Sequence, residues 1–304
     1  VLDPRDPAQL YAVVEDPPWQ APAALIGAGI YRSLDSGETW TRLSDKANFL
    51  PAGALHVDRA APGAILAGSR FKGVQRSDDA GAAWRDSSTA MSLVVLGITI
   101  DPANPETVYA CTVSSGVFKS TDGGSTWRHS GLESDVVFHI AADPHHPGRV
   151  FAGTGRGPAR SDDGGATWTV VGQNAAQQGG PRPLAMVPHV IRPHPTIPDL
   201  IFAGTSAQGV AISEDGGATW RFSNRGLGSG HIFALEIDPL DTDRLYATTS
   251  DAGVWVSDDR GASWAPLNTG LYNEFVTSFA IDPLDPSVVY AGTEGGGVFR
   301  YRRP

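Results

Sequence analysis

Glu133, Asp135 and Glu274 are carboxylates in segments between predicted strands, where side chains are available for acid–base chemistry. Hydrolysis of a glycosidic bond uses two carboxyl groups, one as general acid and one as nucleophile or base, at roughly 5–10 Å. Glu133 with Asp135, or Glu274 with a neighbour such as Glu294, has the residue types for this reaction. These residues are the candidate catalytic groups of a glycoside hydrolase, but the sequence does not set their separations.

A second set of residues is suited to binding. Six of the eight tryptophans belong to a repeated motif, and Trp255 takes an aromatic position in a strand, so Trp19 has no role in the repeat. We expect Trp19 either to anchor its own loop or to offer a stacking surface for a sugar ring or an apolar group. The other candidate ligand-binding residues share a place in or beside predicted loops: Phe71, Arg156, Asn174, Arg225, His231 and Tyr272.

The histidines and the cysteine give little support for a metal or cofactor. His139, His189 and His231 each begin a predicted strand, and imidazole is a common ligand, but no tight spacing of His and carboxylate accompanies them. Cys111 is the only cysteine, so it makes no intrachain disulfide, and its apolar strand predicts burial. Phosphate-binding and dinucleotide-binding glycine motifs are absent from the sequence. We therefore predict no metal site and no cofactor.

The elements that position these residues follow from a repeat. Six segments follow the pattern Ser-x-Asp-x-Gly-x-Thr-Trp, and successive copies begin 41 to 52 residues apart. The spacing is typical of a repeat architecture. In each copy the Gly suits a positive φ and the Asp can accept backbone N–H groups, so we interpret the motif, called a box below, as a structural hairpin. The boxes start at Ser33, Ser77, Ser120, Ser161, Ser213 and Ser257.

Four predicted strands surround each box. The strand typified by Val108–Ala110 recurs seven times, and so does the one typified by Val117–Ser120, which leads into the box. Seven such pairs predict an all-β fold, a seven-bladed β-propeller with four-stranded antiparallel blades and six box hairpins, in one domain over residues 1–304. The seventh copy ends at Tyr301–Pro304 without a box, so the sequence leaves its outer strand unassigned.

The repeat also separates two faces. The boxes share one face with the turns that join first and second strands, and the remaining connections form the other, which we call the upper face. Two of its loops, residues 15–27 and 172–188, are longer than their counterparts. Loops on a rigid scaffold commonly carry binding residues, so we expect a cleft between these loops over a central channel.

The boxes, followed by turns of the Asp-Pro-x-x-Pro type, resemble the Asp-box (BNR repeat) β-propellers over nearly the whole chain. This family includes sialidases, xyloglucan-degrading glycoside hydrolases, the sortilin ectodomain and a photosystem II assembly factor. The resemblance implies a propeller used for binding or for glycoside hydrolysis. The Arg-Ile-Pro segment of sialidases is missing here, and Lys is scarce for the basic patch of the assembly factor.

Composition limits the partners. The net charge of −10 argues against nucleic acid, and no apolar stretch is long enough to insert into a membrane. The chain begins at Val1, and we expect an extracytoplasmic protein whose signal segment has been removed. The leading hypothesis is a monomeric binding propeller for a carbohydrate or protein ligand. A glycoside hydrolase is the alternative, and a protein-docking scaffold is a third interpretation.

Overall fold

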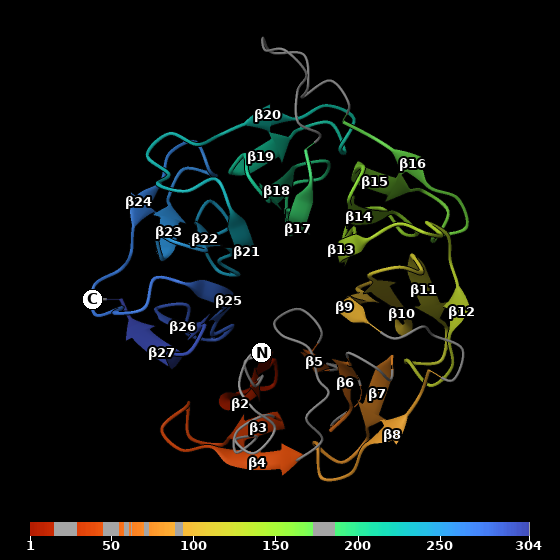
Figure 1. The fold of residues 1–304 in the computed structure, drawn as a ribbon, viewed down its shortest axis with the longest axis horizontal. Coiled ribbons are helices and arrows are strands. Elements are labelled where there is room, and N and C mark those ends of the chain that lie inside the picture. The colour runs from red at the N-terminus through yellow and green to blue at the C-terminus, as the bar shows by residue number, and fades with distance from the viewer. Residues whose placement is uncertain are drawn as a thin grey trace, which may run out of the picture. The chain divides into compact units, whose positions relative to one another are not determined.

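The computed structural model describes residues 1–14, 29–44, 55–57, 61, 63–69, 73–88, 94–172 and 186–303. Two compact units, Val1–Ser134 and Asp135–Pro304, make up the chain, and each is described by itself. The regular structure of the described residues consists of β-strands in seven antiparallel sheets that follow one another in sequence (Figure 1). The fold is all-β, a seven-bladed β-propeller in which each sheet is one blade, as predicted. The single domain over residues 1–304 stays a prediction.

The first unit contains three four-stranded sheets. Their strands are β1 (Leu2–Asp3), β2 (Asp6–Val14), β3 (Gly29–Ser33) and β4 (Thr41–Ser44); β5 (Leu55–Val57), β6 (Ile65–Gly68), β7 (Val74–Ser77) and β8 (Arg85–Asp86); and β9 (Val95–Asp101), β10 (Asn104–Thr112), β11 (Val117–Ser120) and β12 (Arg128–His129).

The second unit contains three four-stranded sheets and one of three strands. Their strands are β13 (Val137–Ala142), β14 (Val150–Thr154), β15 (Gly157–Ser161) and β16 (Thr169–Val170); β17 (Pro188–Pro193), β18 (Ile201–Thr205), β19 (Val210–Ser213) and β20 (Arg221–Phe222); β21 (Ile232–Ile237), β22 (Leu245–Thr249), β23 (Val254–Ser257) and β24 (Ala265–Pro266); and β25 (Val276–Ile281), β26 (Val288–Thr293) and β27 (Gly297–Arg302).

Strands pair in chain order within each sheet, so successive connections lie at opposite ends. The end that carries the boxes and the turns between first and second strands is called the box face, and the opposite end is the upper face. The last sheet differs from the predicted four-stranded blade, because the described residues give β27 no outer neighbour.

Apolar cores of the second unit lie between consecutive sheets. One cluster joins Phe202 and Ile212 of one sheet to Leu235, Leu245 and Trp264 of the next. The second strands β14, β18 and β22 are buried at every residue, because both of their faces are covered. Full burial of a ring such as Phe202 stabilises the fold by roughly 1.5–3 kcal/mol.

Each box closes on itself through the same hydrogen bonds. The Ser hydroxyl donates to Oδ1 of the Asp at 2.7–2.8 Å and accepts the N–H of the Gly four residues after it at 2.8 Å. Asp Oδ1 also accepts the N–H four residues further on at 2.8 Å. The hydroxyl of Thr39 lowers the pKa of Asp35 to about 2, and Thr167 acts likewise on Asp163. The polar atoms of the box are thus engaged within the turn.

His194 takes the place of the turn Asp in one copy. In the other turns of this unit, Oδ1 of Asp143, Asp238 and Asp282 accepts backbone N–H groups just ahead of it. His194 is fully buried, and its Nδ1 accepts the N–H of Ile197 at 3.0 Å while Nε2 lies 3.0 Å from the carbonyl oxygen of Thr242. Nδ1 must be unprotonated to accept, so the neutral imidazole replaces the carboxylate.

Candidate functional site

A continuous row of aromatic rings lies along the first strands of the four sheets of the second unit. Neighbouring ring centroids are 4.7 Å apart for Phe138 and His189, 5.1 Å for His189 and His231, 4.5 Å for His231 and Phe233, and 5.5 Å for Phe233 and Phe275. All five side chains are half-buried. We call this set the aromatic row, and it offers a contiguous stretch of partly exposed ring surface.

β-Bulges determine the direction in which several side chains of the aromatic row point. The first strands β13, β17, β21 and β25 contact one another in that order and lie on the inner side of their sheets (Figure 1). Each of these strands has a register shift at the same position. The residue left out of the pairing is Phe138 in β13, His189 in β17 and Phe233 in β21. A bulge leaves its extra residue unpaired and re-aims the side chain. The recurrent bulges therefore bring rings of separate sheets together.

The imidazoles of His189, within the row, and of His139, beside it, favour the neutral form. Nε2 of His231 lies 3.3 Å from Nδ1 of His189, a contact that requires one protonated and one bare nitrogen. Burial, and then the charge of His231, lowers the pKa of His189. Burial, assisted by Arg192, lowers the pKa of neighbouring His139 to about 3. At neutral pH the imidazoles of His189 and His139 can each donate and accept a hydrogen bond.

An ion pair lies on the same strands. The guanidinium of Arg192 on β17 bonds to the carboxylate of Glu236 on β21, and its Nε donates to the carbonyl oxygen of Leu235 at 3.0 Å. Both charged side chains are about one-third exposed or less, at 35% and 27%. The first strands thus combine aromatic surface with fixed polar groups, the usual composition of a binding site.

Asp135 and Arg156, predicted separately as catalytic and ligand-binding residues, lie together. Nε of Arg156 is 2.8 Å from Oδ1 of Asp135, and the Asp135 side chain is 10% exposed while Arg156 is 66% exposed. The pair lies on the upper face, three residues before Phe138 in the sequence. The carboxylate is committed to a cation, so Asp135 in this state orients Arg156.

The other two catalytic candidates are accessible. Glu133 belongs to the first unit, where its carboxylate is 3.2 Å from Nδ1 of His129 and 74% exposed. Glu274 is exposed and immediately precedes Phe275 of the aromatic row. Its carbonyl oxygen accepts the N–H of Gly253. Of the three carboxylates, Glu274 is therefore the one attached to the row.

The predicted ligand-binding residues separate into three groups. His231 is part of the row, and Tyr272 is close to it in sequence, 81% exposed, with its ring 4.6 Å from that of Phe299. Arg225 is exposed, and its carbonyl oxygen accepts the N–H of the box residue Trp264. Trp19, Phe71 and Asn174 lie outside the described residues, as do most of the two long loops.

Sequence reasoning missed Phe138, Phe233 and Phe275. The signal that would have found the first two is positional. Phe138, His189 and Phe233 each stand five residues before the turn residue Asp143, His194 or Asp238. An alternating strand pattern gives no warning of a bulge, so these residues were indistinguishable from core positions. Over the described ranges no group of three or more His, Cys, Asp or Glu is placed to hold a metal ion.

Comparison with solved structures identifies similar folds. The GH74 xyloglucanase from Xanthomonas campestris aligns with a TM-score of 0.75 at 18% identity, covering 100% of this chain and 51% of that protein. The extracellular domain of a putative hybrid two-component system from B. thetaiotaomicron gives 0.71 at 14% identity, covering 99% and 39%. YCF48 bound to D1 peptide gives 0.67 at 13% identity, covering 91% and 86%.

These likenesses establish the seven-bladed β-propeller fold and, at such identities, the fold alone. The chain spans about half the length of the xyloglucanase it matches. No protein-family model matches the chain, and no curated protein matches it significantly in sequence. Among the described residues, no helix is both long and apolar enough to cross a membrane.

Proposed function

We propose that this chain is an extracytoplasmic ligand-binding propeller of the Asp-box type, which binds carbohydrate on the aromatic row. The row itself carries the proposal. Half-buried rings present flat apolar faces that suit the C–H faces of sugar rings, and their spacing of 4.5–5.5 Å makes the surface continuous. His189, whose pKa is lowered by burial, and His231 can hydrogen-bond sugar hydroxyls, and exposed Tyr272 extends the surface.

The similarity to a xyloglucanase supports oligosaccharides as the first ligands to test. The test measures binding of xyloglucan and cello-oligosaccharides by calorimetry to the wild type and to Phe233→Ala. Loss of one stacking ring is expected to weaken binding about fivefold to tenfold, or roughly 1–1.4 kcal/mol. Phe222→Ala is the matched control, because Phe222 is 36% exposed on the outer strand β20, away from the row.

Equal affinity of the wild type and the Phe233→Ala variant would remove the row from consideration as the ligand site. Trp19, Phe71, Asn174, Arg156 and Arg225 remain proposed contacts, to be tested by the same titrations. A protein ligand is the other proposed partner class, and YCF48, a fold neighbour bound to D1 peptide, supports testing it. We also propose that the protein acts as a monomer.

Glycoside hydrolysis is the second candidate, favoured by exposed Glu274 beside Phe275. Glu274, Glu133 and Asp135 are its proposed catalytic residues. Release of reducing sugar from xyloglucan that disappears in Glu274→Gln, with oligosaccharide binding retained, would establish this activity. Binding without any sugar release would favour the non-catalytic function.

A further inference from the structure

The two histidines of the aromatic row face each other across neighbouring sheets through their ring nitrogens. Nε2 of His231, just before β21, lies 3.3 Å from Nδ1 of His189 on β17, and the two ring planes are inclined by 62°. Both side chains are half-buried. We call these two residues the histidine pair. Its facing nitrogens are the atoms through which imidazole binds metal ions.

The histidine pair is formed by the fold and not by local sequence. His189 and His231 are 42 residues apart in the chain. His189 is the residue left out of the pairing at the bulge of β17, and β17 contacts β21. The sequence placed both histidines at the starts of predicted strands but could not set the distance between them. The prediction of no metal site rested on spacing along the chain, which does not report on ligands supplied by two sheets.

The distance between the two nitrogens fits a shared tetrahedral ion. N–H donors usually lie about 2.7–3.2 Å from their acceptors, so the 3.3 Å contact makes a weak hydrogen bond. Zinc binds imidazole nitrogen at about 2.0–2.1 Å in tetrahedral sites, and two such ligands lie about 3.3–3.4 Å apart. A tetragonal ion such as Cu²⁺ would hold neighbouring ligands at right angles, about 2.8–3.0 Å apart. The observed distance therefore favours zinc.

The separation of the two rings agrees with this interpretation. Imidazoles joined end to end by a straight N–H···N bond of this length would have centroids about 5.6 Å apart. A tetrahedral ion held between the two nitrogens would bring the centroids to about 5.2 Å. The observed centroid separation is 5.1 Å. The rings therefore lean toward each other, as two ligands of one ion do.

Neighbouring side chains hold the two imidazoles in place. Phe138 packs against His189 with ring centroids 4.7 Å apart, and Phe233 packs against His231 at 4.5 Å. The backbone N–H of His231 also donates to Oγ of Ser229 at 3.2 Å. Ligands that are already held in position lose little conformational freedom when an ion binds, and this favours capture of the ion.

The histidine pair supplies two protein ligands. Over the described ranges, no third His, Cys, Asp or Glu completes a metal-binding group with it. Zinc is usually four-coordinate, so two positions are left for water or for donor atoms of a bound ligand. A site with two protein ligands is weaker than a structural zinc centre, and we expect an affinity in the micromolar range.

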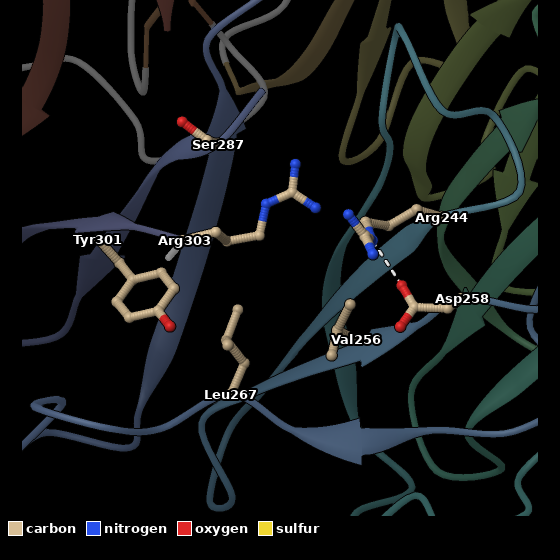
Figure 2. Close-up of a pocket in the computed structure, with 7 residues that line it drawn as sticks. All are labelled: Arg244, Val256, Asp258, Leu267, Ser287, Tyr301 and Arg303. Carbon is tan, nitrogen blue, oxygen red and sulfur yellow. Dashed lines mark hydrogen bonds and ion pairs between the residues drawn. The ribbon is translucent and has the colours of Figure 1, made fainter. Parts of the chain in front are cut away.

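The cavity drawn in Figure 2 is a less suitable place for a cation. It has a volume of about 460 Å³, and Arg244, Asp258 and Arg303 are among the residues that line it. The dashed line in the figure marks the hydrogen bond from Nε of Arg244 to Oδ1 of Asp258, so this carboxylate is already paired with a cation. Two guanidinium groups repel a metal ion, and no histidine is among the described residues of the lining.

We propose that His189 and His231 together bind one zinc ion, through Nδ1 of His189 and Nε2 of His231. The ion takes the place of the proton that lies between these two nitrogens. That proton moves to the outer nitrogen of its own ring, so both rings remain neutral. The proposal does not depend on carbohydrate binding, because both ligands belong to the protein.

The probe is Zn²⁺ alone, added to the protein without sugar and measured by isothermal titration calorimetry. One saturable site is expected. His189→Phe and His231→Phe should each weaken zinc binding at least about tenfold, because phenylalanine keeps a ring in the row and removes one ligand. The control is His129→Gln, at an exposed histidine 3.2 Å from the carboxylate of Glu133, and it should bind zinc as the wild type does. Circular dichroism melting verifies that each variant is folded.

Nitrogen NMR of the imidazoles gives a readout that needs no variant. Without metal, one of the two facing nitrogens carries a proton, whereas zinc requires both of them bare, so one ring should change tautomer. The proposal is overturned if the wild type takes up no zinc at millimolar concentration, or if either phenylalanine variant binds zinc as tightly as the wild type. It is also overturned if zinc binds and the tautomers of both rings stay unchanged. None of these results would affect the carbohydrate proposal, which is tested separately with Phe233→Ala.

Discussion

The carboxylate of Asp79 accepts a hydrogen bond from the backbone of Ala83 and none from its side chain. Oδ1 of Asp79 accepts the N–H of Ala83 at 2.8 Å, but Ala83 has no hydroxyl for Oδ2. In the other boxes a Thr or Ser at this position also donates its side-chain hydroxyl, as Thr126 does to Asp122 and Ser263 to Asp259. The second box therefore has one hydrogen bond fewer than its counterparts.

Ala83→Thr is expected to stabilise the protein by about 0.5–1 kcal/mol, because it supplies the missing donor at an exposed position. Urea unfolding measures the gain in the free energy of unfolding. Ala83→Val is the control, since valine has the same branched shape without a hydroxyl. Equal stabilisation by Val and Thr would mean that the hydroxyl bond is not the source.

Two histidines with lowered pKa values, His139 and His194, predict a loss of stability in mild acid. Burial lowers the pKa of His194 and lowers that of His139 to about 3, so the folded protein resists protons that the unfolded chain takes up below about pH 6.5. The free energy of unfolding should fall as the pH drops from 6.5, by at most about 1.4 kcal/mol per pH unit for each such histidine. The box Asp residues contribute at lower pH. Their pKa values are lowered in the folded protein, so the stability they give is lost only as the pH falls from about 4 to 2.

His194→Asp tests this assignment, because Asp occupies the same position in the neighbouring turns. The variant should remain folded at pH 7 and show a shallower decline between pH 6.5 and 5 than the wild type, as measured by urea unfolding at each pH. An unchanged slope would show that His194 does not contribute in this range.

Gly226→Ala and Gly270→Ala form a matched pair. Both place a side chain at positive φ, which costs each variant about 1–2 kcal/mol. Only Gly226→Ala forces Cβ against the carbonyl oxygen of Trp264, so it should be the more destabilising by at least about 1 kcal/mol. Thermal unfolding of the two variants provides the comparison, and equal melting temperatures would contradict the open space beside Gly270.

Cys111 should be unreactive in the folded protein. Its side chain is fully buried, so a reagent cannot reach the sulfur. Burial also raises the pKa of the thiol, so the reactive thiolate does not form at neutral pH. Labelling with a thiol reagent should proceed only when the first unit opens, and the rate should rise steeply with urea. Rapid labelling of the native protein would disprove the burial of Cys111.

The sequence predicted the fold because its signals are local and repeated. Each box contains its own donors and acceptors within eight residues, so Ser-x-Asp-x-Gly spacing alone specifies the hairpin. Hydrogen bonds confined to a short segment can be inferred without knowing what packs against it.

The candidate site was predicted less well, because its features depend on contacts between sheets. His231 was identified, but Phe138 and Phe233 were missed. A bulge is a feature of how two strands pair, and the alternation of apolar and polar residues along one strand does not reveal it. The Arg156–Asp135 pair joins the loop before β13 to the loop between β14 and β15, which no local spacing reveals.

The self-contained hydrogen bonding of the boxes has a consequence for how the chain folds. Hairpins whose bonds span only a few residues form with little loop-closure entropy, so they can appear before distant segments meet. Six similar hairpins give this chain six comparable starting points, and we expect the docking of one sheet on the next to be the slow step. A substitution that weakens a single hairpin should therefore change the order in which the sheets form more than it changes the final fold.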